Sequence, residues 1–348
     1  MRASIIPYNL KFKQAAGTSR GILYEKESWF IVLESNGIRG IGECSLIPGL
    51  SPENRNLYES ELDWLVENTS AIESWLTVKG NLFPSIKFGI ETALADLNSG
   101  GKQLFEQDEF TSGRSGIPIN GLIWMGDANF MRDQVRTKIE EGFHCIKIKV
   151  GAIDFEEEIS LLKLIRKQFD AKTIEIRLDA NGAFNPKTAM EKLKRLSEFE
   201  IHSIEQPIRP GQIASMTSLS EKSPIPVALD EELIGLYDKN RQFELLNLIK
   251  PAYIILKPSL IGGLQQANQW IALAESLDVG WWATSALESN IGLNAIAQWA
   301  FSTKNPMHQG LGTGQLYTNN FASPLEIRNG CLYHNPSASW NLKMLQTE

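Results

Sequence analysis

The sequence predicts an α/β protein in which a (β/α)8-type barrel follows a smaller N-terminal α+β domain. Three observations predict this fold class. The chain has 348 residues, enough for a barrel of roughly 200–250 residues and a second domain. From about residue 117, short β-rich runs alternate with amphipathic helical runs, as in βα units around a parallel sheet. Polar side chains recur at the ends of those runs, one βα unit apart.

The composition excludes several classes of protein. Hydrophobic residues make up 43% of the chain and charged residues 22%, which suits a globular protein with a packed core. The formal charge of −7 comes from 34 basic and 41 acidic residues scattered along the chain, so nucleic acid is not an expected partner. No run approaches the ~20 apolar residues that span a bilayer, and the N-terminus has no sustained apolar segment of the kind that a signal peptide contains. We expect a cytoplasmic protein with no membrane partner and leave its oligomeric state open.

The cysteines and histidines show no spacing typical of a zinc site. The cysteines are Cys44, Cys145 and Cys331. The histidines are His144, His202, His308 and His334. We expect reduced cysteines and structural roles for both sets. A functional role stays most open for His308, near the predicted eighth strand.

The N-terminal domain is predicted to comprise residues 1–115. Asn36-Gly37 is a strong hairpin signal because both residues tolerate positive φ, and β-rich runs flank it. The predicted elements are strands at 29–33 and 38–42 and helices at about 53–68 and 84–98. Gly100-Gly101 ends the second helix.

The barrel is predicted to comprise residues 116–317. Ile159, Leu162 and Ile165 recur at helical spacing, and Asn185-Pro186 supplies a cap and a first-turn proline for the next helix. Strand ends are expected near Gly121, Lys149, Asp179, Glu205, Asp230, Lys257, Ser285 and Gly312. Residues 318–348 no longer follow the repeat, and we expect them to pack back on the N-terminal domain.

Three carboxylates are predicted to meet at the barrel mouth, because the C-terminal ends of barrel strands point there. Asp179, Glu205 and Asp230 end consecutive strands and would repel one another unless a cation neutralised them. Oxygen ligands without a neighbouring His or Cys favour Mg²⁺, for which Mn²⁺ can substitute. The alternative is a set of helix caps; Asp179 could cap a helix, but Glu205 before Gln206-Pro207 caps poorly.

Lysines flank the three carboxylates. Lys147 and Lys149 share one face of the second strand, and Lys257 ends the sixth. A lysine beside another ammonium group and a divalent cation is a usable base near neutral pH, so we expect Lys147 to tune Lys149. This array suits removal of a proton next to a carboxylate, because a metal ion stabilises the enediolate that forms. Asn181 and Glu231 are expected to orient the ligands or a lysine.

These residues make the chain resemble the enolase superfamily over nearly its whole length, in its muconate-lactonising subgroup and, within that, the o-succinylbenzoate synthases. The segments that carry the resemblance are Lys147-x-Lys149, residues 179–182, residues 203–207, residues 229–231 and Lys257-Pro258. The resemblance implies that the N-terminal domain caps the barrel mouth. It also makes loop 16–21 a candidate lid and loop 43–51 the second capping segment. Arg20 is then either a lid residue that contacts substrate or a surface charge.

Peripheral residues must decide the reaction, because racemases, epimerases, cycloisomerases and dehydratases of the subgroup share the lysines and ligands. Residues 284–292 and 310–314 resemble o-succinylbenzoate synthases. Similar dipeptide epimerases carry Asp-x-Asp at the eighth strand, where this chain has the uncharged Gly310, Gly312 and Thr313. The implied reaction is Mg²⁺-dependent dehydration of 2-succinyl-6-hydroxy-2,4-cyclohexadiene-1-carboxylate in menaquinone biosynthesis.

In that reaction Lys149 would take the proton and Lys257 would stabilise the enediolate, while Ser285, Ser289 and Gly312 would contact this small carboxylate substrate. The alternative in the same superfamily is a dipeptide epimerase or N-acylamino acid racemase, which needs both lysines as bases. A catalytically inactive barrel that serves as a binding protein would instead have gaps in the array, and the sequence has none.

Overall fold

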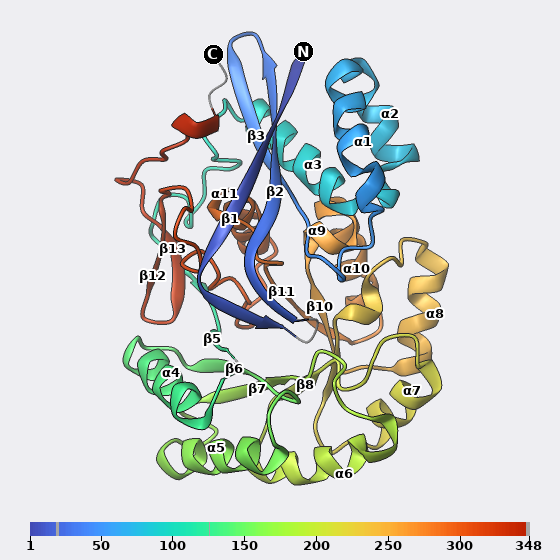
Figure 1. Ribbon diagram of the computed structural model, residues 1–348, viewed down its shortest axis with the longest axis vertical. Helices are drawn as coiled ribbons and strands as arrows, with labels where there is room; N and C mark the ends of the chain where they lie inside the picture. The colour runs from blue at the N-terminus through green and yellow to red at the C-terminus, as the bar shows by residue number, and fades with distance from the viewer. Residues whose placement is uncertain (19–20, 125, 346–348) are drawn as a thin grey trace.

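The computed structural model describes residues 1–18, 21–124 and 126–345. A three-stranded antiparallel sheet lies above a barrel of parallel strands and outer helices (Figure 1). The upper sheet has the order β1-β2-β3. Its strands are β1 (Arg2–Thr18), β2 (Gly21–Ser35) and β3 (Ile38–Ser45). Its helices are α1 (Arg55–Glu67), η1 (Thr69–Ala71), α2 (Ile72–Val78), η2 (Gly80–Leu82) and α3 (Pro84–Asn98).

The predicted hairpin is confirmed. Asn36 and Gly37 have φ values of 53° and 75°, the left-handed conformation that a two-residue hairpin turn requires. Helix α3 then packs directly against β3. A Cβ atom at Gly42 would lie 1.9 Å from the Gly89 carbonyl oxygen, so only glycine permits this approach of helix to strand.

The barrel sheet contains seven strands in the order β11-β10-β9-β8-β7-β6-β5. They are β5 (Gly121–Ile123), β6 (Cys145–Lys149), β7 (Glu175–Asp179), β8 (Ser203–Glu205), β9 (Val227–Leu229), β10 (Tyr253–Leu256) and β11 (Gly280–Ala283). The helices are α4 (Ala128–Glu140), α5 (Phe155–Gln168), α6 (Pro186–Leu196), η3 (Ser197–Phe199), α7 (Ile213–Lys222), η4 (Glu231–Leu233), α8 (Lys239–Ile249), α9 (Pro258–Ile261), α10 (Gly263–Ser276) and α11 (Asn290–Ser302). Asn185 caps α6 through a hydrogen bond from the Lys187 amide, as predicted.

The eighth segment closes the ring with less pairing than predicted. Gln309 bridges Ile119, and Gly310 bridges Thr284, both in parallel. Pairing at 309–310 rather than near Gly312 corrects the expected strand end, and no strand is assigned across residues 309–314. The glycines of this segment have low β propensity, which accounts for the short contact.

The first barrel strand also differs from the prediction. Gly121 was expected to end this strand, but β5 begins there and ends at Ile123. The apolar residues Leu122 and Ile123 continue the strand beyond the glycine.

The C-terminal segment contacts both parts of the molecule. Strands β12 (Leu325–Arg328) and β13 (Cys331–His334) form a sheet with β4 (Ile117–Pro118) in the order β12-β13-β4. Phe321, which precedes β12, and Leu345 of η5 (Lys343–Leu345) belong to an apolar cluster with Phe30 and Val32 of β2. The segment therefore contacts both the N-terminal sheet and β4, at the start of the barrel domain.

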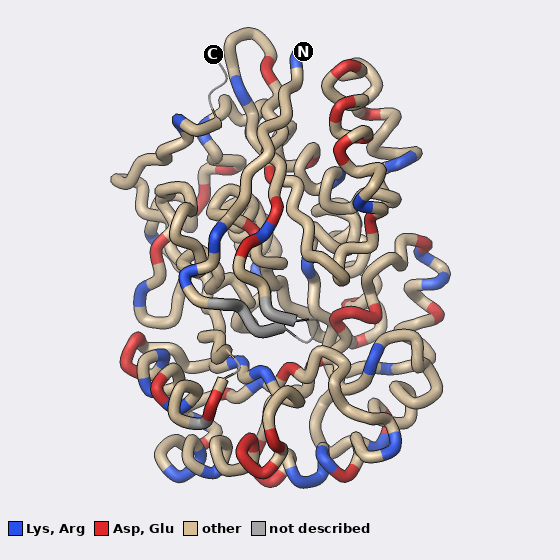
Figure 2. Tube along the Cα trace, viewed as in Figure 1, with Lys and Arg blue, Asp and Glu red and all other residues tan. Residues whose placement is uncertain are grey.

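Basic and acidic residues are interspersed along the outer helices of the barrel in the view of Figure 2. This agrees with the scattered charges of the sequence. Among the helices of the described residues, none is both long and apolar enough to cross a membrane.

Candidate active site

The ends of β6, β7 and β8 bring charged residues side by side. Lys149 pairs in register with Asp179, and Asp179 pairs with Glu205. Asp230 directly follows β9 and Lys257 directly follows β10. Because neighbouring parallel strands end at one level, the spacing of one βα unit places all five residues at one end of the sheet.

Lys147 and Lys149 both reach Asp179. The Lys147 Nζ atom lies 2.9 Å from Asp179 Oδ2 and 2.7 Å from each carboxylate oxygen of Glu205. The Lys149 Nζ atom lies 3.3 Å from the same Asp179 oxygen and donates to Asn181 Oδ1 at 2.5 Å. The lysines thus offset the carboxylate repulsion that the sequence had suggested only a metal could relieve.

Lys257 donates a hydrogen bond to Asp230 Oδ2. Asn181 links Lys149 to Glu231, because its Nδ2 atom donates to Glu231 Oε1 at 3.2 Å. Gln206, a residue that the sequence did not single out for this role, accepts a hydrogen bond from the Asp230 amide at 3.1 Å. Its position directly after Glu205 could have predicted that it lies near the carboxylates.

Burial and charge act in opposite directions on the ionisable groups of this array. Burial lowers the pKa of Lys147, but Asp179, Glu205 and Asp230 raise it more, so its pKa lies above the ordinary value. Burial raises the pKa of Asp179, but the three lysines lower it below the ordinary value. For Glu205, burial and the negative charge of Asp179 raise the pKa to about 8. Lys147 is therefore held as an ammonium ion.

A cavity of about 110 Å³ opens at the charged array. Its charged lining residues are Lys147, Lys149, Asp179 and Lys257, and Asn181 lies with them. The other lining residues are uncharged: Ile47, Pro48, Leu50, Asn120, Leu122, Trp124, Thr284, Ser285, Ala286, Leu287, Gly310, Gly312 and Thr313. A mostly apolar cavity with a few convergent polar groups is the usual form of a small-molecule site.

The predicted substrate contacts fall in different places. Ser285 and Gly312 line the cavity. Ser289 does not; it is buried, caps α11, and donates its hydroxyl to Glu43 at 2.5 Å. Its position is that of a helix cap at the contact between domains. Arg20 lies outside the described residues.

Two polar residues of the cavity wall were not among the predicted substrate contacts. Asn120 and Thr284 are buried and line the cavity. Within the described chain, Asn120 Oδ1 and Thr284 Oγ1 have no hydrogen-bond partner. Their places in the sequence could have predicted this location, because Asn120 precedes β5 and Thr284 follows β11.

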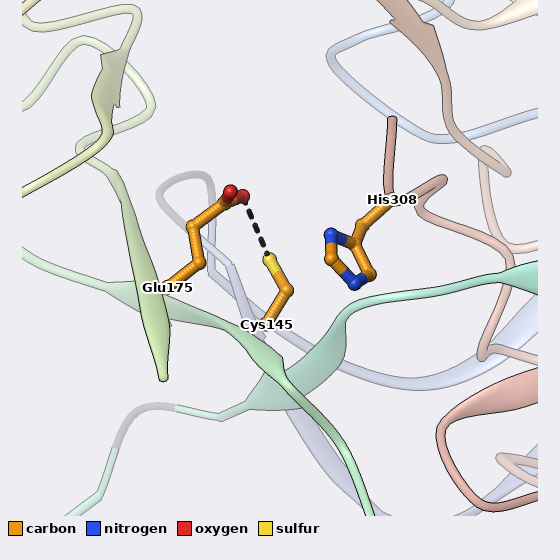
Figure 3. A group of neighbouring side chains, drawn as sticks. All are labelled: Cys145, Glu175 and His308. Carbon is orange, nitrogen blue, oxygen red and sulfur yellow. Dashed lines mark hydrogen bonds between the residues drawn. The ribbon is translucent and has the colours of Figure 1, made fainter. Parts of the chain in front are cut away.

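A second group of possible metal ligands lies at the opposite end of the strands (Figure 3). Ligand atoms of Cys145, Glu175 and His308 all lie within 4.8 Å of one another, and the Cys145 thiol donates to Glu175 Oε1 at 3.2 Å. Arg177 Nε donates to that oxygen at 2.7 Å, so Glu175 already has a cationic partner. Burial also raises the pKa of Cys145, which favours the thiol over the thiolate that binds metals. The expected structural role fits this group.

Comparison with known proteins relates the whole chain to one superfamily. Residues 130–337 match the family described as enolase C-terminal domain-like. The chain is 48% identical to the o-succinylbenzoate synthase of Desulfotalea psychrophila, over 93% of this chain and 96% of that protein. It is 28% identical to the L-Ala-D/L-Glu epimerase of Bacillus subtilis, but over only 48% of this chain and 45% of that protein.

Solved structures show the same fold. The crystal structure of MenC from Desulfotalea psychrophila matches with a TM-score of 0.87 and 44% identity, over 96% of this chain and 99% of that one. A dipeptide epimerase from Enterococcus faecalis, complexed with Mg and a dipeptide, matches with a TM-score of 0.83 and 21% identity, over 97% of both chains. The predicted barrel with its N-terminal α+β capping domain is thereby confirmed, and the chain belongs to the enolase superfamily.

Proposed function

We propose that the chain is an o-succinylbenzoate synthase, which removes water from 2-succinyl-6-hydroxy-2,4-cyclohexadiene-1-carboxylate in menaquinone biosynthesis. One observation carries the proposal: Lys149 and Lys257 both line the cavity, and the eighth segment contributes only uncharged residues to its wall. The 48% identity to the Desulfotalea psychrophila o-succinylbenzoate synthase over nearly both chains supports the same reaction.

Asp179, Glu205 and Asp230 fit a Mg²⁺ site by their donor chemistry. All three are buried carboxylates, and oxygen donors are the ligands that Mg²⁺ prefers. Ammonium groups of Lys147 and Lys257 contact these carboxylates, and this concentration of negative charge supports the proposal of a cation site. When bound, Mg²⁺ would stabilise the negative charge that develops on the substrate carboxylate.

Lys149 is the proposed base. Asp179 and Asn181 orient its Nζ atom at the cavity, where the free amine would take the proton from the ring carbon next to the carboxylate. The hydroxyl group on the adjacent ring carbon then leaves, and the ring becomes aromatic. Lys149, now protonated, returns its proton to the departing oxygen, so one water molecule is released and the lysine is regenerated.

Lys257 is proposed to remain an ammonium ion throughout. Burial lowers its pKa, but Asp230 and Glu205 raise it above the ordinary value. A fixed positive charge at the cavity stabilises the anionic ring through charge and cation–π attraction. One lysine that acts as the base and one that stays charged suit a dehydration, which needs a single base.

Epimerisation of a dipeptide or racemisation of an N-acylamino acid is the second candidate, because both Lys149 and Lys257 line the cavity. Those reactions need the lysines to alternate as base and acid. The neutral Gly310, Gly312 and Thr313 offer no carboxylate to a substrate ammonium group, which favours the dehydratase.

The test uses purified protein with Mg²⁺ and freshly prepared cyclohexadiene substrate, and follows the loss of substrate absorbance. Lys149→Ala and a chelator-treated sample serve as controls. Turnover that both controls abolish supports the dehydratase. Absence of turnover, with solvent deuterium entering the α-carbon of an N-acylamino acid or dipeptide, would contradict the dehydratase and support the second candidate.

A further inference from the structure

A buried carboxylate lies behind the part of the cavity wall that contains Ser285. Glu288 follows β11 and is 0% exposed. One of its oxygens accepts a hydrogen bond from the Ser285 hydroxyl at 2.6 Å, and the other accepts one from the Ser259 hydroxyl at 2.5 Å. Ser285 lines the cavity, and Ser259 lies two residues beyond Lys257. Glu288 therefore joins the ends of two barrel strands from behind the cavity wall.

The contact with Glu288 determines how Ser285 presents its hydroxyl group. Its hydrogen is directed to Glu288, and its oxygen accepts hydrogen bonds from Thr313 Oγ1 at 2.8 Å and from the Leu287 amide at 3.1 Å. A serine hydroxyl has one hydrogen and two lone pairs. All three are occupied, so Ser285 shapes the wall and has no hydrogen left for a substrate carboxylate.

The hydrogen bond from the Leu287 amide to Ser285 also stabilises an unusual backbone conformation. Leu287 has a φ of 63°, a left-handed conformation that costs about 1 kcal/mol or more for a residue other than glycine. The Leu287 amide is held by Ser285, and its carbonyl oxygen accepts from the Tyr317 hydroxyl at 2.6 Å. The cavity wall at Ser285 and Leu287 thus contains a strained turn, which Glu288 stabilises through its hydrogen bond with Ser285.

The capping domain supplies positive charge to Glu288. Burial raises the pKa of Glu288 above its ordinary value, whereas Lys26 of β2, which is 1% exposed, acts in the opposite direction. Both serines donate to the Glu288 oxygens, and the ionised form that Lys26 favours can only accept hydrogen bonds. The direction of the Ser285 hydroxyl therefore depends on the carboxylate at this position.

We propose that Glu288 is a positioning residue, which orients Ser285 and the turn at Leu287. It thereby determines the shape of the cavity wall that contacts the part of the substrate remote from the metal ligands. The effect on substrate binding rests on the proposed function, whereas the effect on the turn does not. Glu288 touches no reacting atom, so its removal should weaken substrate binding more than it slows the chemical step.

The test compares Glu288→Gln with the unchanged chain. The amide has nearly the same size, but its NH₂ group donates where the carboxylate accepted, so one serine must reverse its hydrogen bond. We expect KM for the cyclohexadiene substrate to rise about tenfold, which corresponds to about 1.4 kcal/mol, with kcat changed by less than about threefold. A kcat loss without a KM change would overturn the proposal.

Two further variants separate positioning from general loss of stability. Glu53→Gln is the matched control: Glu53 is a buried carboxylate that accepts from the Ser85 amide at 2.7 Å in the N-terminal domain. It should leave KM unchanged. Ser285→Ala should remove most of the effect of Glu288→Gln, because residues that act as a unit are not additive. Additive effects on KM in the double variant, or an equal KM rise in Glu53→Gln, would overturn the proposal.

Amide hydrogen exchange tests the turn independently of the reaction. Residues 284–289 should exchange faster in Glu288→Gln than in the unchanged chain and in Glu53→Gln, because the Leu287 amide loses a fixed acceptor. Unchanged exchange there would refute the positioning role. Faster exchange in a chain that does not turn over the cyclohexadiene substrate would refute the proposed function alone.

Discussion

The side-chain nitrogens of Lys147 and Lys149 meet the same carboxylate oxygen, Oδ2 of Asp179, at 2.9 and 3.3 Å. Lys147 has a second carboxylate, Glu205, at 2.7 Å, whereas Lys149 has the neutral amide of Asn181 as its other partner. Two lysines on one strand therefore differ in the negative charge around them. The one with less carboxylate contact is the better candidate for a base.

Lys149→Ala should lower kcat for dehydration by about 10²–10⁴-fold, the range typical of a positioned general base. Steady-state kinetics on the cyclohexadiene substrate would measure the loss, and circular dichroism would show that the fold is kept. Lys163→Ala, at an exposed position on α5, is the matched control and should behave as the unchanged chain. A Lys149→Ala variant with more than a tenth of the original kcat would exclude Lys149 as the base.

Magnesium should raise the stability of the protein through the three carboxylates. A ligand that binds only the folded state at 100 times its Kd contributes about 2.7 kcal/mol, which a thermal unfolding series in Mg²⁺ would detect as a higher Tm. Glu205→Gln should remove most of this shift, because Glu205 is one of the three proposed ligands. Glu61→Gln, in the N-terminal helix α1, should retain it. An identical Mg²⁺ shift in Glu205→Gln would place the ion elsewhere.

Glu158 should make stability depend on pH. Burial raises its pKa from 4.5 to about 7, although the Gly151 amide, which donates to it at 2.5 Å, acts in the opposite direction. Between these values the folded state holds a proton that the unfolded state has lost. The stabilisation present below pH 4.5 is therefore lost as pH rises to about 7, with a slope of up to about 1.4 kcal/mol per pH unit.

Urea unfolding at several pH values between 4.5 and 8 would measure this slope. Glu158→Gln keeps an oxygen acceptor for the Gly151 amide and does not titrate, so the difference in unfolding free energy between the two proteins should shrink or reverse across that interval. A difference that stays constant with pH would show that the Glu158 pKa is the same in both states.

Gly312 should tolerate a methyl group but not a charge. A Cβ atom there would meet its nearest neighbours at 3.5 and 3.7 Å, which is ordinary van der Waals contact. Gly312→Ala should therefore fold normally and raise KM only modestly. Gly312→Asp should raise KM for the dianionic cyclohexadiene substrate at least tenfold, because it adds a negative charge to the wall of the cavity. Equal KM values in the two variants would remove charge as the reason for the neutral eighth segment.

Much of the fold could be read from local patterns. The signal at Asn36-Gly37 predicted the hairpin, and Gly100-Gly101 helped to define the helix that spans Pro84–Asn98. Steric and hydrogen-bonding preferences of neighbouring residues determine these features. The predicted ends of β6, β7 and β8 are also those of the structure, because a polar residue interrupts each apolar run at the barrel mouth.

The sequence by itself determined which charged residues meet, since residues one βα unit apart must share one end of a parallel barrel. Only the tertiary structure decided how they pair. No local pattern specifies the contacts that join distant segments or orient side chains. These are the sharing of Asp179 by two lysines, the contact of Ser289 with Glu43, the closure at Gln309 and Gly310, and the hydrogen bond from Ser285 to Glu288. Their geometry depends on how helices and strands pack, because packing sets the last few ångströms between side chains.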